Sequence, residues 1–593
     1  MCGIIGRWNQ KSVIHRDEFR CARDSMKHRG PDGRGEYFTK DDNIALGHRR
    51  LSFMDLSRAG RQPMSNEDGS IWITVNGEIY NYRELKSRLK AKGHILKSGC
   101  DSEIIIHAYE EWGCDCISQL KGMFAFGLYD SKKKQMLIAR DRFGIKPLYY
   151  LHDNAKFIFA SELKGITTFD DIKPELDFTS FADFFVYRYV PSPKTIWQGI
   201  QKLPAAHFML ISENRPPEIK QYWELSPQDQ ICDEKMVIEK IDYFLAESVK
   251  GHLMSDVPVG SFLSGGYDSS ALVYYCRRNS YTPMTFSIGF ENWAGSEHRF
   301  AETVAGIFGT DHTSKIVTDS DLDLVDKLVF HYDEPIADIS IIPTYIVSKL
   351  AAERVKAVLS GEGADEIFAG YTWHRPSRPH KYTLAWLRQM AGSILKKNGF
   401  YSVDQYREAM AMGKFDRPML QELLNPDLHE CIDQDPDWYY RQHHNPAISS
   451  IKRFQYMDVK TFMSELVLTK IDRASMANSL EVRVPFLDHE LVEYMFSVSE
   501  KTYYKPKHQK YILYNNIKNA LPQEILNRKK QGFVGPDKYY ENFEWYKAIL
   551  KSGNLIGDKI INETAIDSWF NNHDHWRLWK TAVMEKWYTH WCK

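Results

Sequence analysis

The sequence predicts an α/β protein built from more than one domain. The chain has 593 residues, which is long for a single hydrophobic core. In its second half, the short apolar runs 257–263, 284–290 and 355–360 alternate with longer helical patterns. Such alternation is typical of a doubly wound parallel sheet, which binds its ligand at the carboxyl ends of the strands.

The first candidate functional residue is at the start of the chain, which reads Met1-Cys2-Gly3. The small side chain at position 2 should allow removal of the initiator methionine, which would leave a thiol and a free α-amino group on Cys2. An α-amino group titrates near pH ~8 and can accept the thiol proton, so no histidine is needed. Taken alone, Cys2 could equally be a small buried hydrophobe, as free cysteines often are.

A set of motifs after Cys2 favours the nucleophile. The set comprises His28-Arg29-Gly30-Pro31-Asp32, Arg50-Leu51-Ser52, Asn76-Gly77-Glu78-Ile79-Tyr80-Asn81, Asp101-Ser102-Glu103, Gly122–Phe126 and Arg140–Tyr149. With these motifs in this order, residues 1 to about 205 resemble the glutaminase domain of the N-terminal-nucleophile (class II) glutamine amidotransferases. The resemblance implies a four-layer αββα Ntn-hydrolase fold of the α+β class.

The chemistry of these side chains fits glutamine. Arg50 suits the α-carboxylate and Asp101 the α-ammonium of the substrate. The Asn76 amide and the Gly77 backbone N–H are matched donors for the oxyanion that thiolate attack creates. The resemblance adds Leu51 and Glu78 as glutamine contacts. The alternatives are a surface ion pair for the charged residues and a hairpin turn for Asn-Gly.

An anion-binding loop is predicted after the strand at 257–263. Its residues are Ser264, Gly265, Gly266, Tyr267, Asp268 and Ser269, and an apolar helical run follows. Backbone N–H groups and hydroxyls at a helix start bind phosphate. No Gly-Lys-Ser/Thr ends the loop, so it is not a Walker loop. It resembles the Ser-Gly-Gly-x-Asp-Ser pyrophosphate loop of the ATP pyrophosphatases; the alternative is a glycine turn with an Asx cap.

Two aspartates, Asp268 and Asp365, follow predicted strands. Carboxylates are hard oxygen ligands and suit a Mg²⁺ ion that bridges ATP phosphates. Acidic side chains beside polyphosphate would otherwise repel it, which favours the metal site over solvated turns.

Three more segments extend the resemblance: Asp333–Tyr345, Lys470–Asp488 and Arg528–Phe533. With them, the chain from Cys2 to about Pro536 resembles the glutamine-hydrolysing asparagine synthetases. The resemblance implies that a carboxylate is adenylated by ATP and that ammonia from glutamine then displaces AMP. It assigns pyrophosphate and metal contacts to Ser264, Gly265, Gly266, Asp268 and Ser269, and further ATP contacts to Leu263, Ile288, Ser360 and Gly361. It also assigns the base for ammonia attack to Glu362 and phosphate stabilisation to Lys530.

We therefore expect a glutaminase domain over 1–205, a connection over 206–235 and an ATP-pyrophosphatase synthetase domain with added helices over 236–593. Aspartate is the favoured acceptor, and another carboxylate such as a sugar acid is the alternative. A scaffold without activity is disfavoured, because it would have no reason to keep the set of reactive residues. The resemblance also suggests a homodimer.

Composition limits the other partners. The formal net charge is −1, which gives no reason to expect nucleic acid or an anionic membrane as a partner. No apolar run reaches the length of a membrane span, and no signal peptide precedes Cys2. The nine cysteines include no Cys-x-x-Cys pair and predict reduced thiols in a cytoplasmic protein. Trp576, Trp579, Val583 and Trp587 recur at helical spacing and predict a packed C-terminal helix.

Overall fold

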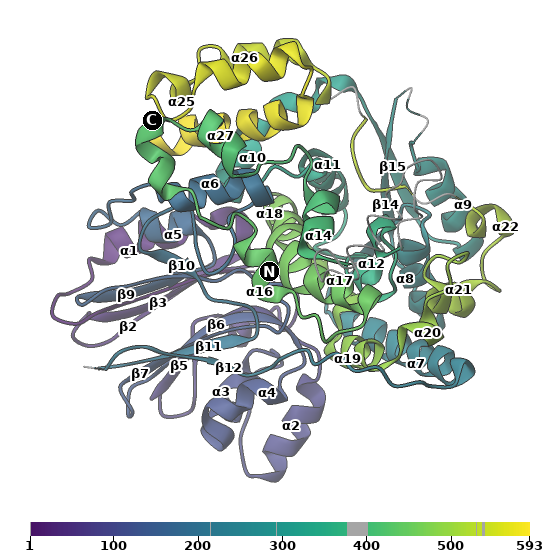
Figure 1. Ribbon diagram of the computed structural model, residues 1–593. Coiled ribbons are helices and arrows are strands. Elements are labelled where there is room, and N and C mark those ends of the chain that lie inside the picture. The colour runs from purple at the N-terminus through teal and green to yellow at the C-terminus, as the bar shows by residue number, and fades with distance from the viewer. Residues whose placement is uncertain are drawn as a thin grey trace.

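The computed structural model describes residues 2–213, 215–291, 293, 295–375, 401–528, 531–536 and 540–593. Over these residues the chain forms two antiparallel sheets, then a parallel sheet surrounded by helices (Figure 1). No described helix has both the length and the apolar character needed to cross a bilayer. All nine cysteines are free thiols.

The first two sheets form the N-terminal half and have six strands each. The first has the order β10-β8-β9-β1-β3-β2, and the second has the order β12-β11-β7-β6-β5-β4. The strands of the first sheet are β1 (Gly3–Asn9), β2 (Gly33–Phe38), β3 (Ile44–Arg50), β8 (Tyr149–His152), β9 (Lys156–Ala160) and β10 (Ile200–Lys202). Those of the second are β4 (Met64–Ser65), β5 (Ile71–Ile79), β6 (Gly122–Asp130), β7 (Gln135–Arg140), β11 (His207–Ser212) and β12 (Glu218–Gln221).

These sheets are the inner layers of a four-layer αββα sandwich. Helices α1 (Arg16–Asp24), α5 (Leu163–Thr167) and α6 (Phe178–Tyr187) lie beyond the first sheet, and α2 (Tyr82–Ala91), α3 (Glu103–Trp112) and α4 (Cys116–Gln119) lie beyond the second (Figure 1). The pleat of β1 explains the layering, because successive side chains point to opposite faces. Ile4 belongs to the core between the sheets, whereas Ile5 packs with Phe19 of α1. The predicted αββα fold is confirmed.

The third sheet has five strands in the order β15-β14-β13-β16-β17, and all its pairings are parallel. Its strands are β13 (Val259–Phe262), β14 (Thr285–Phe290), β15 (His312–Val317), β16 (Ala357–Leu359) and β17 (Glu481–Arg483). Helix α7 (Glu234–His252) precedes β13. The helices that follow it along the sheet are α8 (Tyr267–Arg278), α9 (His298–Phe308), α10 (Leu324–Tyr332), α11 (Ile341–Ala352) and α12 (Ala364–Ile367). The order reverses between β13 and β16, and such a switch point is where doubly wound sheets bind ligand. This predicted architecture is also confirmed.

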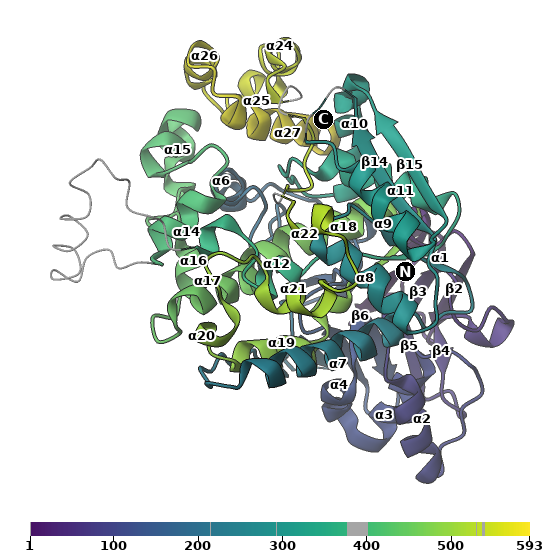
Figure 2. The ribbon, with the colours of Figure 1, turned by 90° about the vertical axis from the view of Figure 1, so that its right-hand side faces the viewer.

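The added helices complete the second half (Figure 2). They are α14 (Val403–Met410), α15 (Arg417–Leu423), α16 (Trp438–His443), α17 (Ser450–Asp458), a π-helical segment (Val459–Val467), α18 (Leu468–Met476), α19 (His489–Ser497), α20 (Glu500–Tyr503), α21 (Tyr511–Ile517), α22 (Gln523–Leu526), α24 (Phe543–Leu550), α25 (Asn554–Gly557), α26 (Glu563–Asn571) and α27 (His575–Cys592). In α27, Trp579, Val583 and Trp587 are buried, as the helical spacing predicts, and Trp576 is partly buried.

Two segments differ from their simplest interpretation. Asn76 and Gly77 lie inside β5, opposite Ala125 and Phe124 of β6, and not in a hairpin turn. Within 206–235, β11 and β12 extend the second sheet beyond residue 205. The strand pairing of the N-terminal half thus continues into the range treated above as a connection.

Candidate active site

The nucleophile candidate Cys2 is 8% exposed and directly precedes β1. Its backbone N–H donates to Asn76 Oδ1 at 2.9 Å, and its carbonyl accepts from Arg29 Nε at 3.1 Å. Its Sγ lies 3.9 Å from the carbonyl oxygen of Leu51. Burial raises the pKa of the Cys2 thiol, against the lowering effect of the positive amino terminus. The thiol therefore needs a local base before it can attack.

Asn76 offers a free donor beside this cysteine. Its side chain is fully buried, and its Nδ2 has no hydrogen-bond partner among the described residues. Because Oδ1 already accepts from the Cys2 N–H, the amide is oriented and Nδ2 is the donor that remains available. Gly77 follows with φ of +150°, and a Cβ there would lie 2.0 Å from the carbonyl oxygen of Met123. Only glycine fits so close to β6.

Arg50 is the last residue of β3, where the loop that contains Asp55 begins, and Asp101 lies in the loop before α3. Arg50 Nη2 donates to the carbonyl oxygens of Met54 and Asp55 at 3.1 and 2.7 Å. Asp101 is 3% exposed and accepts from the Ile79 N–H at 2.6 Å, which ties it to the end of β5. Asp55 joins the two loops, since its Oδ2 accepts from the N–H of Gly99 at 2.8 Å.

Glu78 is placed differently from the other predicted glutamine contacts. Its side-chain carboxylate is buried and lies 3.4 Å from Arg483 Nη2, on β17 of the other half. Arg483 also contacts Glu481 at 2.6 Å. Burial opposes the charge of Glu481, but the amino terminus and Arg483 lower its pKa to about 2. The start of β17 thus lies near the nucleophile candidate, and the charge of Glu481 adds to the raised pKa of the Cys2 thiol.

The predicted pyrophosphate loop lies between β13 and α8. Ser264 Oγ and Ser269 Oγ are 3.1 Å apart, and Ser269 Oγ also accepts from the Ser264 N–H at 3.1 Å. Gly266 is the N-cap residue of α8, so free N–H groups of the first turn point into the loop. Leu263, which directly follows β13, and Ile288, in the second half of β14, are buried.

The two candidate metal ligands come together at the switch point. The Lys510 Nζ atom lies 2.5 Å from Asp268 and 2.8 Å from Asp365. Burial disfavours the charge of Lys510, but the two carboxylates raise its pKa, so it remains an ammonium. Gly361 permits this approach, since a Cβ there would lie 2.9 Å from the Asp268 Cβ. Sequence reasoning did not identify Lys510, because no local motif marks residues 508–511.

The remaining synthetase candidates follow β16. Ser360 is buried, and its N–H donates to the Arg483 carbonyl at 2.9 Å. Glu362 has a buried Oε2 without a hydrogen-bond partner among the described residues. Lys530 lies outside the described residues. Arg528 donates to the Ser264 carbonyl at 3.1 Å, so this arginine lies at the pyrophosphate loop.

Buried ion pairs connect the two halves. Arg29 lies 2.8 Å from Asp472 and 2.9 Å from Glu162, and Arg473 lies 2.8 Å from the same Glu162. Arg473 and Arg483, which lie in the Lys470–Asp488 segment, both form such pairs.

Comparison with known proteins defines the class first. A glutamine amidotransferase domain model matches residues 1–223, and an asparagine synthase model matches residues 240–589. The chain is therefore an amidotransferase with a synthetase half, and it belongs to the glutamine-hydrolysing asparagine synthetase family. It is an enzyme, a carbon–nitrogen ligase that takes its amido group from glutamine.

Three relatives illustrate the range of the family. Asparagine synthetase (glutamine-hydrolysing) 1 of Bacillus subtilis is 32% identical, and the match covers 99% of this chain and 96% of the relative. Asparagine synthetase (glutamine-hydrolysing) 3 of the same organism is 29% identical over 96% and 93% of the two chains. The protein named amidase chry2 of Gibberella zeae is also 29% identical, over 95% and 92%.

Proposed function

We propose that this enzyme hydrolyses glutamine at Cys2 and uses the ammonia to convert aspartate into asparagine, with ATP cleaved to AMP and pyrophosphate. The observation that carries the proposal is the oriented amide of Asn76, whose Oδ1 accepts from the Cys2 N–H while its buried Nδ2 stays free. The names of the two Bacillus relatives support aspartate as the acceptor.

In the glutaminase half, removal of Met1 makes the Cys2 nitrogen an α-amino group, 2.9 Å from Asn76 Oδ1. This amine takes the thiol proton, and Sγ attacks the carboxamide carbon of glutamine. The Asn76 Nδ2 and the Gly77 N–H then donate to the oxyanion. Ammonia leaves with the proton from the amine, and water hydrolyses the thioester to glutamate. Arg50 and Asp101 bind the α-carboxylate and α-ammonium of the substrate.

In the synthetase half, a carboxylate oxygen of the acceptor attacks the α-phosphorus of ATP, and pyrophosphate leaves. Ser264, Ser269 and the first turn of α8 bind the phosphates. Ammonia then attacks the acyl carbon, and AMP leaves with the electron pair of the broken C–O bond. Glu362 accepts the proton that the attacking nitrogen must lose, a role that its free buried Oε2 suits.

Mg²⁺ fits the pair formed by Asp268 and Asp365. Both carboxylates converge on one cationic group, the Lys510 ammonium, at distances of 2.5 and 2.8 Å. Two carboxylates at the carboxyl ends of adjacent strands are a donor set that Mg²⁺ uses together with substrate phosphates. When bound, the ion would neutralise phosphate charge. Lys510 would then contact the phosphates or remain paired with one carboxylate.

A second acceptor class deserves a direct test. The relative named amidase chry2 matches nearly the whole chain, and its name does not mention asparagine. The residues that hold glutamine and ATP would serve either acceptor, since the chemistry at Cys2 and at the phosphates is the same.

An assay of pyrophosphate release distinguishes aspartate from another carboxylate as the acceptor. Purified enzyme is given ATP, Mg²⁺ and glutamine, with and without L-aspartate. We expect aspartate-dependent pyrophosphate and an equal amount of asparagine. Glutamine hydrolysis without any aspartate-dependent pyrophosphate would overturn aspartate as the acceptor and direct the search to sugar acids and other carboxylates. With Cys2→Ala, synthesis should persist with ammonia and stop with glutamine.

A further inference from the structure

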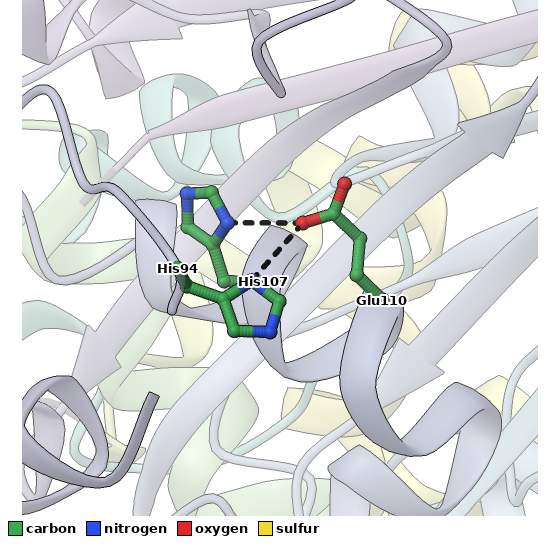
Figure 3. Close-up of side chains that lie close together, drawn as sticks. All are labelled: His94, His107 and Glu110. Atoms are coloured by element: carbon green, nitrogen blue, oxygen red, sulfur yellow. Dashed lines mark hydrogen bonds and ion pairs between the residues drawn. The ribbon is translucent and has the colours of Figure 1, made fainter. Parts of the chain in front are cut away.

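Two histidines and a glutamate come together in the glutaminase half, beyond the second sheet. His107 and Glu110 lie on α3 three residues apart, so they share one face of the helix. His94 follows α2 and points toward the same face (Figure 3). Within the described parts of the chain, this is the one group of three or more His, Cys, Asp or Glu side chains whose ligand atoms all lie within 4.8 Å of one another.

The distances suit a small divalent ion. Glu110 Oε2 lies 3.0 Å from His107 Nδ1 and 3.5 Å from His94 Nδ1. A zinc ion has ligands at about 2.0–2.2 Å, so two neighbouring tetrahedral ligands are about 3.4 Å apart. The Asn66 amide donates to Glu110 Oε1 at 2.8 Å. That contact leaves Oε2 turned toward both rings.

The far side of each ring faces a second carboxylate. His94 Nε2 lies 3.4 Å from Glu111, and His107 Nε2 lies 3.7 Å from Glu103. Glu103 is itself held, because it accepts from the N–H groups of Lys97 and Ser98 at 2.7 and 2.8 Å. Metal-binding histidines commonly donate their other ring nitrogen to a carboxylate, which fixes the tautomer and raises ligand basicity.

The alternative to a bound metal ion is that both histidines are protonated and form ion pairs with the neighbouring carboxylates. Burial opposes protonation of His107, but Glu103 and Glu110 raise its pKa. The two ring centroids are 5.3 Å apart, so protonating both would place two like charges side by side. Glu103, Glu110 and Glu111 contact these two rings, and Lys92 pairs with Glu111 at 2.5 Å. Two negative charges therefore remain in excess when the rings are neutral. One cation bound by both Nδ1 atoms would balance the negative charge. It would also explain why both Nδ1 atoms face Glu110 Oε2.

We propose that His94, His107 and Glu110 bind a divalent transition-metal ion of the zinc class, with at least one position open to water. This site is separate from the ATP site and does not depend on the proposed acceptor. Its ligands His94 and His107 flank the segment 95–106, which contains the glutamine-binding candidate Asp101. The bound ion would therefore hold the loop of the glutamine pocket against α3.

The test uses the full-length protein, stripped with a chelator and kept in excess Mg²⁺ so that the carboxylate pair near ATP is occupied. Co²⁺ is titrated and followed by its visible d–d absorption, and Zn²⁺ is titrated by calorimetry. We expect one ion per chain. Affinity should fall at least about tenfold in His94→Ala and Glu110→Gln, and about tenfold in Glu103→Gln, which removes an outer carboxylate. His15→Ala, at an exposed histidine that directly precedes α1, is the matched control and should bind as the unmodified protein does.

Three results would overturn the site. The first is no stoichiometric binding at Zn²⁺ concentrations up to about 0.1 mM. The second is unchanged affinity in both His94→Ala and Glu110→Gln. The third is loss of binding in Cys2→Ala, which would place the ion on the nucleophile instead. His94 and Glu110 are not buried, so their variants should fold, and circular dichroism checks this.

Discussion

Asn76→Asp isolates the proposed oxyanion donor. The substitution preserves the size of the side chain and the Oδ1 acceptor that holds the Cys2 N–H at 2.9 Å. It replaces the free Nδ2 donor with an oxygen. Loss of one oxyanion donor lowers kcat by about 10²–10³, or about 2.7–4 kcal/mol. Because Asn76 is fully buried, the new carboxylate also disfavours the neighbouring thiolate, so we expect a loss of at least about 10².

The assay measures glutamate release from glutamine, together with ammonia-dependent pyrophosphate release on the same preparation. The donor acts on the oxyanion, so kcat for glutamine should fall while KM changes little. Ammonia-dependent synthesis should be unchanged, because it bypasses Cys2. Asn572→Asp, an exposed position near the end of the chain, is the matched control for the added charge.

A loss of glutaminase kcat of less than about threefold would refute the reasoning, since a missing oxyanion donor costs far more. An equal loss of ammonia-dependent synthesis would refute it in another way. It would show that the substitution disturbs the whole chain rather than one transition state.

Three other substitutions test Lys510, Gly77 and Glu366, a buried residue of α12. Lys510→Met should abolish ammonia-dependent pyrophosphate release and leave glutaminase activity intact; it should also lower stability in Mg²⁺-free urea unfolding by up to about 3 kcal/mol, since it removes the buried ammonium that Asp268 and Asp365 both contact, and unchanged release would contradict its assignment. Burial and a neighbouring carboxylate raise the pKa of Glu366 to about 8 from 4.5. The folded state therefore binds a proton that the unfolded state releases, and the free energy of unfolding should fall between about pH 5 and 8 by up to about 1.4 kcal/mol per pH unit. Glu366→Gln should flatten this slope in urea melts, and an equally steep slope would refute the shift. Gly77→Ala, whose Cβ would meet a carbonyl oxygen at 2.0 Å, should lose glutamine-dependent but not ammonia-dependent synthesis; Gly306→Ala, with open space around its Cβ, should retain both.

Strands and loops were predictable where the pattern is local. The apolar runs at 257–263, 284–290 and 355–360 became β13, β14 and β16 because buried parallel strands have apolar residues on both faces. The αββα layers were predicted only because the motifs after Cys2 resemble those of the class II glutaminase domain. Periodicity alone does not show which sheet a strand joins. The domain boundaries, the homodimer and the cytoplasmic location stay predictions.

Contacts between distant segments were not predictable. Lys510 reaches Asp268 from 242 residues along the chain, and no motif surrounds it. Glu78 belongs to a glutaminase motif, yet its carboxylate pairs with Arg483 of the synthetase half. The cluster of His94, His107 and Glu110 combines an irregular segment with one face of α3, and only the packing of α2 against α3 brings these segments together.

The buried ion pairs between the halves restrict how the two halves can be exchanged by recombination during evolution. Arg29 and Glu78 belong to one half, and their partners Asp472 and Arg483 belong to the other. A charge that loses its buried partner costs about 3–5 kcal/mol, which is a large part of the stability of a domain. Recombination that joined this glutaminase half to a foreign synthetase half would leave Arg29 paired with Glu162 but would remove the partner of Glu78, unless the new half supplied a cation at the matching position. We therefore expect substitutions of these paired residues to occur together in the two halves.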